Sequence, residues 1–183
     1  MSTDRSYYAL QPAKFRLDGG AMFGIIPKPL WERGAPADSL NRIDMALRML
    51  IIKDGERVVA VDCGIGEYHS EKFEQRFDIR REDNQIAAAL KEIGHTPEDV
   101  TDFIISHLHF DHVGGIVQQD PNNNQLLPIF PNATCHLHRD HYQYAINNSG
   151  RDSGSFHCDK FMPAIEHYQN RDQLNWLEGD EGV

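Results

Sequence analysis

Three histidines and one aspartate lie within a six-residue stretch, at His107, His109, Asp111 and His112. The apolar run 103–105 before them is typical of a short buried strand. Because alternate residues of an extended segment point the same way, His107 and His109 can meet at one ion. A turn after them would carry Asp111 and His112 to a second ion. Imidazole nitrogen and carboxylate oxygen bind zinc at about 2.0–2.2 Å, and also bind iron or manganese. The spacing therefore predicts a two-metal ligand cluster.

Two glycines, Gly114 and Gly115, follow the cluster directly. Consecutive glycines permit a backbone turn that a residue with a Cβ atom would resist, so we expect the ligand loop to fold back here. The alternative is a histidine-rich loop that binds no metal. The strand before the cluster and the glycines after it supply the context that favours the metal site.

The cluster resembles the H-x-H-x-D-H signature of the metallo-β-lactamase superfamily, and the sequence meets that signature at all of its fixed positions. Other segments resemble landmarks of the branch that contains acyl-homoserine lactonase-like and methyl parathion hydrolase-like enzymes: 18–24, 27–31, 41–43 and 61–66. The likeness extends over nearly the whole chain. It implies an α/β fold, the αββα sandwich, whose two halves are each a sheet with helices on the outer face and hold the metals between them.

The resemblance also implies an activity, that of a metal-dependent hydrolase with two divalent ions, zinc being favoured over iron or manganese. His107 and His109 would hold the first ion, and Asp111 and His112 the second. Bound ions lower the pKa of water to about 7, so a metal-bridging hydroxide would attack an ester-like bond, with a lactone as the favoured small-molecule substrate. Asp111 would be the catalytic residue that passes a proton to the leaving group.

A second H-x-H-x-D-H sequence occupies residues 136–141, in different surroundings. The polar segment 131–133 precedes it in place of an apolar strand, and Tyr142 follows in place of glycine. We expect Asp140 to be a helix N-cap with His141 in the first turn. In the resembled family this region is a strand that leads into a helix and binds no metal. The first copy is therefore predicted to be the sole ligand set.

The superfamily's other ligands all follow the signature: a third histidine for the first ion, a bridging carboxylate and a late histidine for the second ion. His157 and His167 lie in segments that do not resemble the expected ones, and residues 177–183 look like the hairpin that leads to the missing histidine. We therefore expect residues 1–183 to form a single incomplete domain, the N-terminal half of the sandwich without its C-terminal half. One half alone would expose an apolar sheet face.

Three explanations of this incompleteness remain open. The first is that a second polypeptide or a dimer completes the fold. The second is that the gene is truncated, and the third is that the chain has a compact fold of its own. Two alternatives to the lactone-cleaving enzyme also remain. One is a thioester hydrolase of the glyoxalase II-like type, which uses the same ligands. The other is a catalytically incomplete half-domain that is inactive alone and needs a second polypeptide.

Composition limits the class of protein and its partners. Hydrophobic residues make up 40% and charged residues 25% of the chain, which is typical of a globular domain. The formal net charge of −10 disfavours nucleic acid as a partner. The N-terminal residues lack the apolar core of a signal peptide, and no run is long enough to span a membrane. Three cysteines without paired spacing argue against a disulfide framework. These features favour a cytoplasmic protein without membrane contact.

The elements that must position the cluster alternate along the chain. Apolar runs at 45–52 and 57–62 are joined by 53–56, whose Asp-Gly pair predicts a hairpin. Residues 84–93 have the spacing of an amphipathic helix, which the glycine at 94 ends. The strand before the ligand cluster follows this helix.

Four further residues are candidates for supporting roles. Asp62 ends a strand, and the resemblance implies that it lies beneath the metal loop and orients a ligand histidine through the ring N–H. The alternative is a turn residue at a strand end. Met22, Phe23 and Trp31 lie among glycines and prolines, and the resemblance implies a hydrophobic wall over the metals. The alternative is that they plug the edge of the sandwich.

Overall fold

The structure is a computed structural model that describes residues 5–81, 84–120, 122–123, 125–147, 150 and 152–179. Two sheets are present in this part of the chain. The strands of the larger sheet are β1 (Arg5–Asp18), β2 (Arg42–Asp54), β3 (Arg57–Val61), β4 (Arg80–Arg81), β5 (Asp102–Ile104), β8 (Thr134–His138) and β9 (Leu174–Leu177). Their order is β4-β1-β2-β3-β5-β8-β9. A two-stranded sheet consists of β6 (Val117–Gln119) and β7 (Leu126–Pro128).

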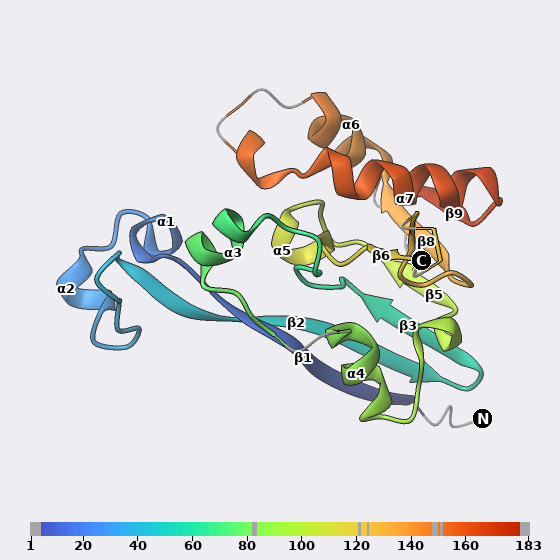
Figure 1. Ribbon diagram of the computed structural model, residues 1–183, viewed down its shortest axis with the longest axis horizontal. Coiled ribbons are helices and arrows are strands. Elements are labelled where there is room, and N and C mark those ends of the chain that lie inside the picture. Colours follow the sequence, from blue (N-terminus) through green and yellow to red (C-terminus); the bar gives the residue numbers. More distant parts are fainter. Residues whose placement is uncertain are drawn as a thin grey trace.

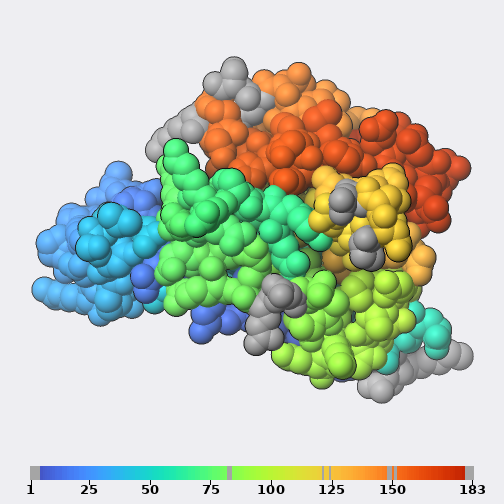
Figure 2. Space-filling model, viewed as in Figure 1, coloured from blue at the N-terminus to red at the C-terminus, as the bar shows by residue number. Residues whose placement is uncertain are grey.

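Short helices connect these strands (Figure 1). They are α1 (Gly19–Phe23), α2 (Lys28–Trp31), α3 (Glu71–Phe77), α4 (Gln85–Lys91), α5 (Phe110–Val113), α6 (Arg139–Asn147) and α7 (Cys158–Asn170), with 3-10 turns η1 (Pro97–Asp99) and η2 (Ser153–Ser155). β1 and β2 form a long antiparallel ribbon, whereas β3, β5, β8 and β9 run parallel. Figure 2 shows the orange and red α6–α7 region packed against the yellow β6–β7 hairpin. This is the mixed α/β architecture that the sequence predicts.

The predicted hairpin and helix are both confirmed. β2 and β3 pair around a two-residue turn in which Gly55 has a φ of 62°, a left-handed conformation that glycine adopts without strain. β2 begins earlier than expected because residues 42–44 continue its pairing with β1. In α4 the side chains of Ile86, Ala89 and Leu90 are buried, as the helical spacing predicts.

One face of the large sheet carries the main core. Met49 and Ile51 of β2 and Phe103 of β5 are at most 1% exposed, and they belong to the same cluster as Leu90 of α4 and Phe161 of α7. Helices therefore cover this face. Burying a large apolar side chain contributes about 1.5–3 kcal/mol, so this layer holds the parallel strands in register.

The opposite face is less covered in the part of the chain that the structure describes. Tyr7 and Leu50 point to this side and are 62% and 37% exposed. Next to them a polar network crosses three parallel strands. Asp102 accepts hydrogen bonds from Arg57 (2.8 and 3.1 Å) and from the Thr101 hydroxyl (2.7 Å), and its Oδ1 lies 3.0 Å from Nε2 of His136.

These contacts lower the pKa of Asp102 to about 2. Burial acts in the opposite direction and raises the pKa, but the hydrogen bonds from Arg57, Thr101 and His136 outweigh it. Because the folded pKa lies below the unfolded value of about 3.9, the carboxylate contributes about 2 kcal/mol of stability above pH 4. That contribution is lost as the pH falls through 4 toward 2.

Asp102→Asn is therefore expected to weaken the acid dependence of stability. Urea unfolding at pH 7 and pH 3 should show a smaller loss of unfolding free energy in the variant than in the wild type, by about 1–2 kcal/mol. Asp159→Asn is a matched control, because the Asp159 side chain is 74% exposed. Equal losses in wild type and Asp102→Asn would show that the network does not stabilise the ionised carboxylate.

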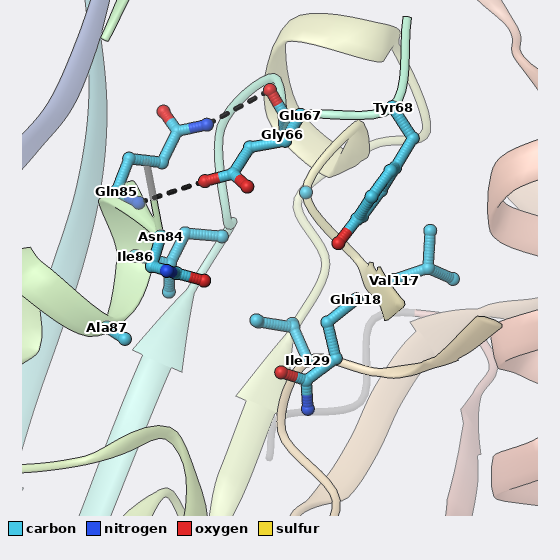
Figure 3. Close-up of a pocket in the computed structure, with 11 residues that line it drawn as sticks. Gly66, Glu67, Tyr68, Asn84, Gln85, Ile86, Ala87, Val117, Gln118 and Ile129 are labelled. Atoms are coloured by element: carbon cyan, nitrogen blue, oxygen red, sulfur yellow. Dashed lines mark hydrogen bonds between the residues drawn. The ribbon is translucent and has the colours of Figure 1, made fainter. Parts of the chain in front are cut away.

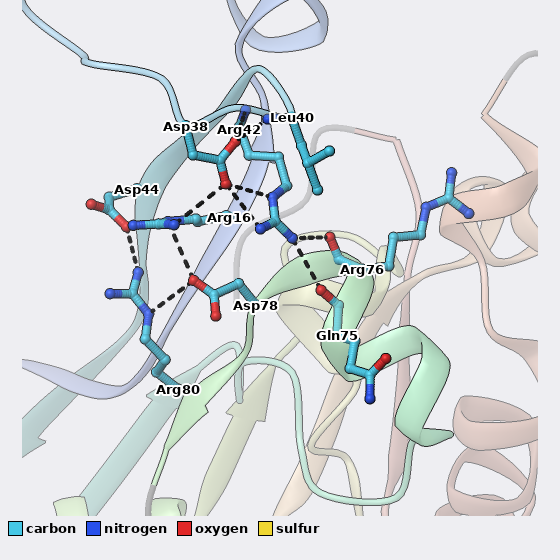
Figure 4. A network of polar contacts seen from close by, with 9 residues as sticks. All are labelled: Arg16, Asp38, Leu40, Arg42, Asp44, Gln75, Arg76, Asp78 and Arg80. Atoms are coloured by element: carbon cyan, nitrogen blue, oxygen red, sulfur yellow. Dashed lines mark hydrogen bonds and ion pairs between the residues drawn. The ribbon is translucent and has the colours of Figure 1, made fainter.

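A second polar network fixes α3 to the end of the β1–β2 ribbon (Figure 4). Nη1 of Arg42 donates to the carbonyl oxygens of Gln75 (3.0 Å) and Arg76 (2.7 Å), in the last turn of α3. Nε of the same Arg42 side chain donates to Asp38 (2.9 Å). Arg16 also reaches the Asp38 carboxylate, at 3.4 Å. A single arginine thus donates to two carbonyl oxygens at the C-terminal end of α3, where the helix itself supplies few donors.

Candidate metal centre

The four residues of the first motif gather at one place beyond the end of β5. His107 and His109 lie in the segment between β5 and α5, and Asp111 and His112 lie in α5. The His107 ring centroid is 4.6 Å from that of His109 and 3.9 Å from that of His112. Oδ2 of Asp111 lies 3.6 Å from Nε2 of His112. The turn that follows the two extended histidines is the short helix α5, which carries the later pair back toward the earlier one.

The side chains are close, but their donor atoms do not converge on one point. Among the described residues, no group of three or more His, Cys, Asp or Glu side chains is placed so that it could hold a metal ion. The types of donor nevertheless suit zinc, iron or manganese, since imidazoles and a carboxylate lie together. The ligand assignment therefore remains a prediction whose residues the fold brings together.

Asp62 lies beneath this cluster and is 8% exposed. Its carboxylate accepts hydrogen bonds from the backbone N–H of Ser106 (2.9 Å) and the Ser106 hydroxyl (2.8 Å), and lies 2.8 Å from Nδ1 of His112. An ionised carboxylate can only accept, so Nδ1 of His112 carries a proton. In the neutral ring Nε2 then keeps its lone pair, and the role of Asp62 in orienting a metal ligand stays a prediction.

The histidine pKa values differ because their surroundings differ. Burial, and then the neighbouring rings of His112 and His109, lowers the pKa of His107 to about 4. Burial also opposes the charged form of His112, but the Asp62 hydrogen bond and the charges of Asp111 and Asp62 outweigh it and raise the His112 pKa. His107 is therefore neutral near pH 7, which is the form that binds metals.

Gly114 and Gly115 are needed for a different reason from the one expected. Gly114 has an ordinary helical φ of −58°, so left-handed freedom is not used there. A Cβ atom on Gly114 would lie 2.3 Å from the carbonyl oxygen of Ile65, and one on Gly115 would lie 2.4 Å from that of Cys63. The glycines thus let the ligand loop approach the backbone that follows β3, which carries Asp62.

The expected hydrophobic wall lies at some distance from the loop. Trp31 is 6% exposed and stacks on Phe23, with 5.0 Å between the ring centroids. Its ring packs directly on Gly19, where a Cβ atom would lie only 2.4 Å from the ring. Met22 is 45% exposed. Figure 1 shows α1 and α2 at the far end of the β1–β2 ribbon, with α3 between them and α5. This arrangement favours edge packing for Trp31, and a wall over the metals stays a prediction.

Other aromatic residues do contact the ligand loop, and they were not predicted from the sequence. Phe73 and Phe77 of α3 lie 5.2 and 5.0 Å from the ring of Phe110, the residue between His109 and Asp111. His157 stacks on the same Phe110 ring at 5.3 Å. The signal was present, because two phenylalanines four residues apart after Ser70, the N-cap of α3, predict an aromatic helix face.

The second H-x-H-x-D-H motif forms a strand and a helix, as predicted. α6 begins at Arg139, so Asp140 lies in the first turn rather than at the N-cap. The motif's histidines each have a hydrogen-bonding partner in the protein. Those partners are Asp102 for His136, the carbonyl oxygen of Gly179 for His138, and the backbone N–H of Leu108 for His141. The expected hairpin at 177–183 extends beyond the described residues, because 180–183 lie outside them.

A small pocket lies behind the ligand loop, with an empty volume of about 370 Å³ that includes space open to solvent (Figure 3). Nε2 of Gln85 donates to the carbonyl oxygen of Gly66 (3.0 Å), and the backbone N–H of Gln85 donates to the Glu67 carboxylate (3.1 Å). Tyr68 and Ile129 also line it. The lining of the pocket does not include the clustered histidines, so the pocket is separate from the candidate metal centre.

A mixed sheet with helices and a histidine-rich loop after a parallel strand define the class of fold, and family comparison agrees. The sequence model of the Metallo-beta-lactamase superfamily matches residues 48–151, and the chain belongs to that superfamily. An N-acyl homoserine lactonase from Bacillus cereus is 34% identical over 84 residues, which cover 41% of this chain and 34% of the relative. The N-acyl homoserine lactonase AttM from Azorhizobium caulinodans is 39% identical over 68 residues, covering 37% of this chain and 22% of AttM.

Solved structures show the same fold. A probable metal-dependent hydrolase from Staphylococcus aureus matches with a TM-score of 0.83 and 28% identity, over 100% of this chain and 63% of that chain. AidC, a dizinc quorum-quenching lactonase in complex with a product, matches with a TM-score of 0.66 and 22% identity, over 99% of this chain and 60% of that one. The chain therefore spans less than two thirds of each of these relatives. No described helix has the length and apolar character needed to cross a membrane.

Proposed function

We propose that this chain carries the metal-binding part of a hydrolase that cleaves an ester-like bond, with a lactone as the favoured substrate. One observation supports this most directly: three imidazoles and Asp111 gather at one loop, and Asp62 fixes the proton of His112 on Nδ1. The similarity to relatives named N-acyl homoserine lactonase supports a lactone as the substrate.

The proposed roles follow from where each side chain lies. His107 and His109 would hold a first divalent ion, and Asp111 and His112 a second, with zinc favoured. Such ions, when bound, supply an activated water at neutral pH and polarise the substrate carbonyl. Asp111, itself one of the proposed ligands, would take the proton that the attacking water releases and pass it to the leaving-group oxygen. Asp62 would keep Nε2 of His112 available throughout.

The surface beside the loop supports a small substrate with an apolar part. Phe73 and Phe77 are partly buried in an apolar cluster with Phe110, so aromatic surface adjoins the polar cluster. Binding sites for small molecules commonly combine an apolar lining with a few polar groups. The net charge of −10 disfavours nucleic acid as substrate.

Completion of the site and its location are parts of the proposal. We propose that the remaining ligands of the centre come from outside the described residues, with a second polypeptide or a dimer as one source. A cytoplasmic location is supported by Cys63, Cys135 and Cys158, which are all free thiols, as is usual in a reducing compartment.

The test is a substrate panel on the purified chain after it has been loaded with zinc, iron(II) or manganese(II). We expect the purified chain to bind metal. Hydrolysis of an acyl-homoserine lactone is expected once the remaining ligands are supplied, and Asp111→Asn should then reduce it strongly. Turnover of a thioester but not of the lactone would select the glyoxalase II-like alternative. Metal binding without turnover of any ester would select the incomplete half-domain, and absence of metal binding would contradict the proposal.

A further inference from the structure

One histidine of the second motif, His141, forms a hydrogen bond with the backbone of the first motif. His141 lies in the first turn of α6, and its Nε2 accepts a hydrogen bond from the backbone N–H of Leu108 at 2.8 Å. Leu108 is the residue between His107 and His109. A side chain 33 positions away along the chain thus holds the peptide that joins the first two proposed ligands.

The direction of this hydrogen bond fixes the state of the imidazole. A backbone N–H can only donate, so Nε2 of His141 must carry the lone pair, and the proton of the neutral ring resides on Nδ1. Burial lowers the pKa of His141, which agrees with a neutral ring. The Leu108 side chain is 0% exposed and packs in the main core. The Leu108 backbone is therefore held by its amide on one side and by its side chain on the other.

The neighbouring segment encloses the same peptide. His109 forms an isolated antiparallel bridge with Phe156, and the Phe156 ring lies 4.8 Å from the His109 ring and 6.1 Å from the His141 ring. From the other side, Asp62 holds the Ser106 N–H. The ligand loop is thus fixed at Ser106 by Asp62, which follows β3, and at Leu108 by His141 of α6.

We propose that His141 is a positioning residue that sets the relative placement of His107 and His109 by accepting the N–H of the peptide between them. Its consequence for metal binding rests on the proposed function, whereas the hydrogen bond itself does not. The mechanism is local: alternate side chains of an extended segment point the same way only while the intervening peptide keeps its orientation.

The experiment compares two substitutions at one position. His141→Gln keeps an acceptor, because the amide oxygen of glutamine can reach about where Nε2 lies, whereas His141→Leu keeps apolar bulk and removes the acceptor. His138→Gln is the matched control, since it removes another histidine of the same motif, whose ring bonds the Gly179 carbonyl oxygen instead.

The first readout needs no metal. Nitrogen-15 NMR of the wild type should show His141 protonated on Nδ1, and hydrogen exchange of the Leu108 amide should be slow. In His141→Leu the Leu108 amide should exchange at least tenfold faster while amides of β5 are unchanged, and His141→Gln should restore most of the protection. Unchanged Leu108 exchange in His141→Leu, or a wild-type His141 protonated on Nε2, would overturn the proposal.

The second readout is zinc affinity by titration. Loss of a hydrogen bond that orients a ligand weakens metal binding by about 10–100-fold, and this is the result expected for His141→Leu. His141→Gln and His138→Gln should bind as the wild type does. Wild-type affinity in His141→Leu despite faster Leu108 exchange would refute the positioning role. A wild-type chain that binds no zinc would refute the proposed function, while the exchange rates would still decide the His141 contact.

Discussion

His109→Ala is expected to abolish metal binding and turnover together. His109 is one of two proposed ligands of the first ion, and removal of a ligand should exceed the roughly 100-fold loss that follows removal of an outer partner. The His109 side chain is 31% exposed, so the unfolding free energy of the metal-free variant should lie within about 1 kcal/mol of the wild-type value. Elemental analysis, a lactone assay and urea unfolding measure these three quantities.

A matched control separates this effect from general loss of a histidine. His167→Ala removes a histidine in the last turn of α7 that no part of the proposed centre uses. It should retain metal and activity. Retention of wild-type metal content by His109→Ala would refute the ligand assignment.

Asp62→Ala is expected to weaken both the metal centre and the fold. The substitution leaves the Ser106 N–H and Nδ1 of His112 without their acceptor, and the Ser106 hydroxyl keeps only its contact with Nδ1 of His107. A buried donor without a partner costs about 1–3 kcal/mol, so unfolding free energy should fall by about 2–4 kcal/mol. Zinc affinity should fall by about 10–100-fold, because the His112 ring is no longer oriented.

Asp62→Asn distinguishes orientation from stability. The amide oxygen of asparagine can still accept from Ser106, but its NH2 group would face Nδ1 of His112 and favour the opposite tautomer. We expect Asp62→Asn to lose less stability than Asp62→Ala and to lose a similar amount of zinc affinity. Asp44→Ala removes an exposed carboxylate and is the control, which should bind zinc as the wild type does. Wild-type zinc affinity in both Asp62 variants would show that Asp62 does not orient a ligand.

Local signals in the sequence were sufficient for much of the fold. The Asp-Gly pair predicted the β2–β3 hairpin, and the spacing of Ile86, Ala89 and Leu90 predicted α4. Both depend on residues close together along the chain. The surroundings of the two similar motifs likewise predicted a loop for the first and a helix at the end of the second, whereas the strand over the second was implied by the family resemblance.

Contacts between distant segments could not be predicted in the same way. Position 114 requires glycine because the carbonyl oxygen of Ile65 lies where a Cβ atom would be. His141 is bonded to the backbone amide of Leu108, in a segment 33 positions away. Neither partner has a type or spacing that marks it in the sequence. Trp31 is similar, because a large apolar residue beside glycines fits a wall or an edge, and only the packed structure shows it against Gly19.

The most direct measurement is X-ray diffraction from crystals loaded with zinc, with data collected on both sides of the zinc absorption edge so that the ions are located by their anomalous signal. We predict one ion at about 2.0–2.2 Å from ring nitrogens of His107 and His109, and a second bound by Asp111 and His112. Ions bound at His136, His138 and His141 instead, or no ion at either motif, would contradict it.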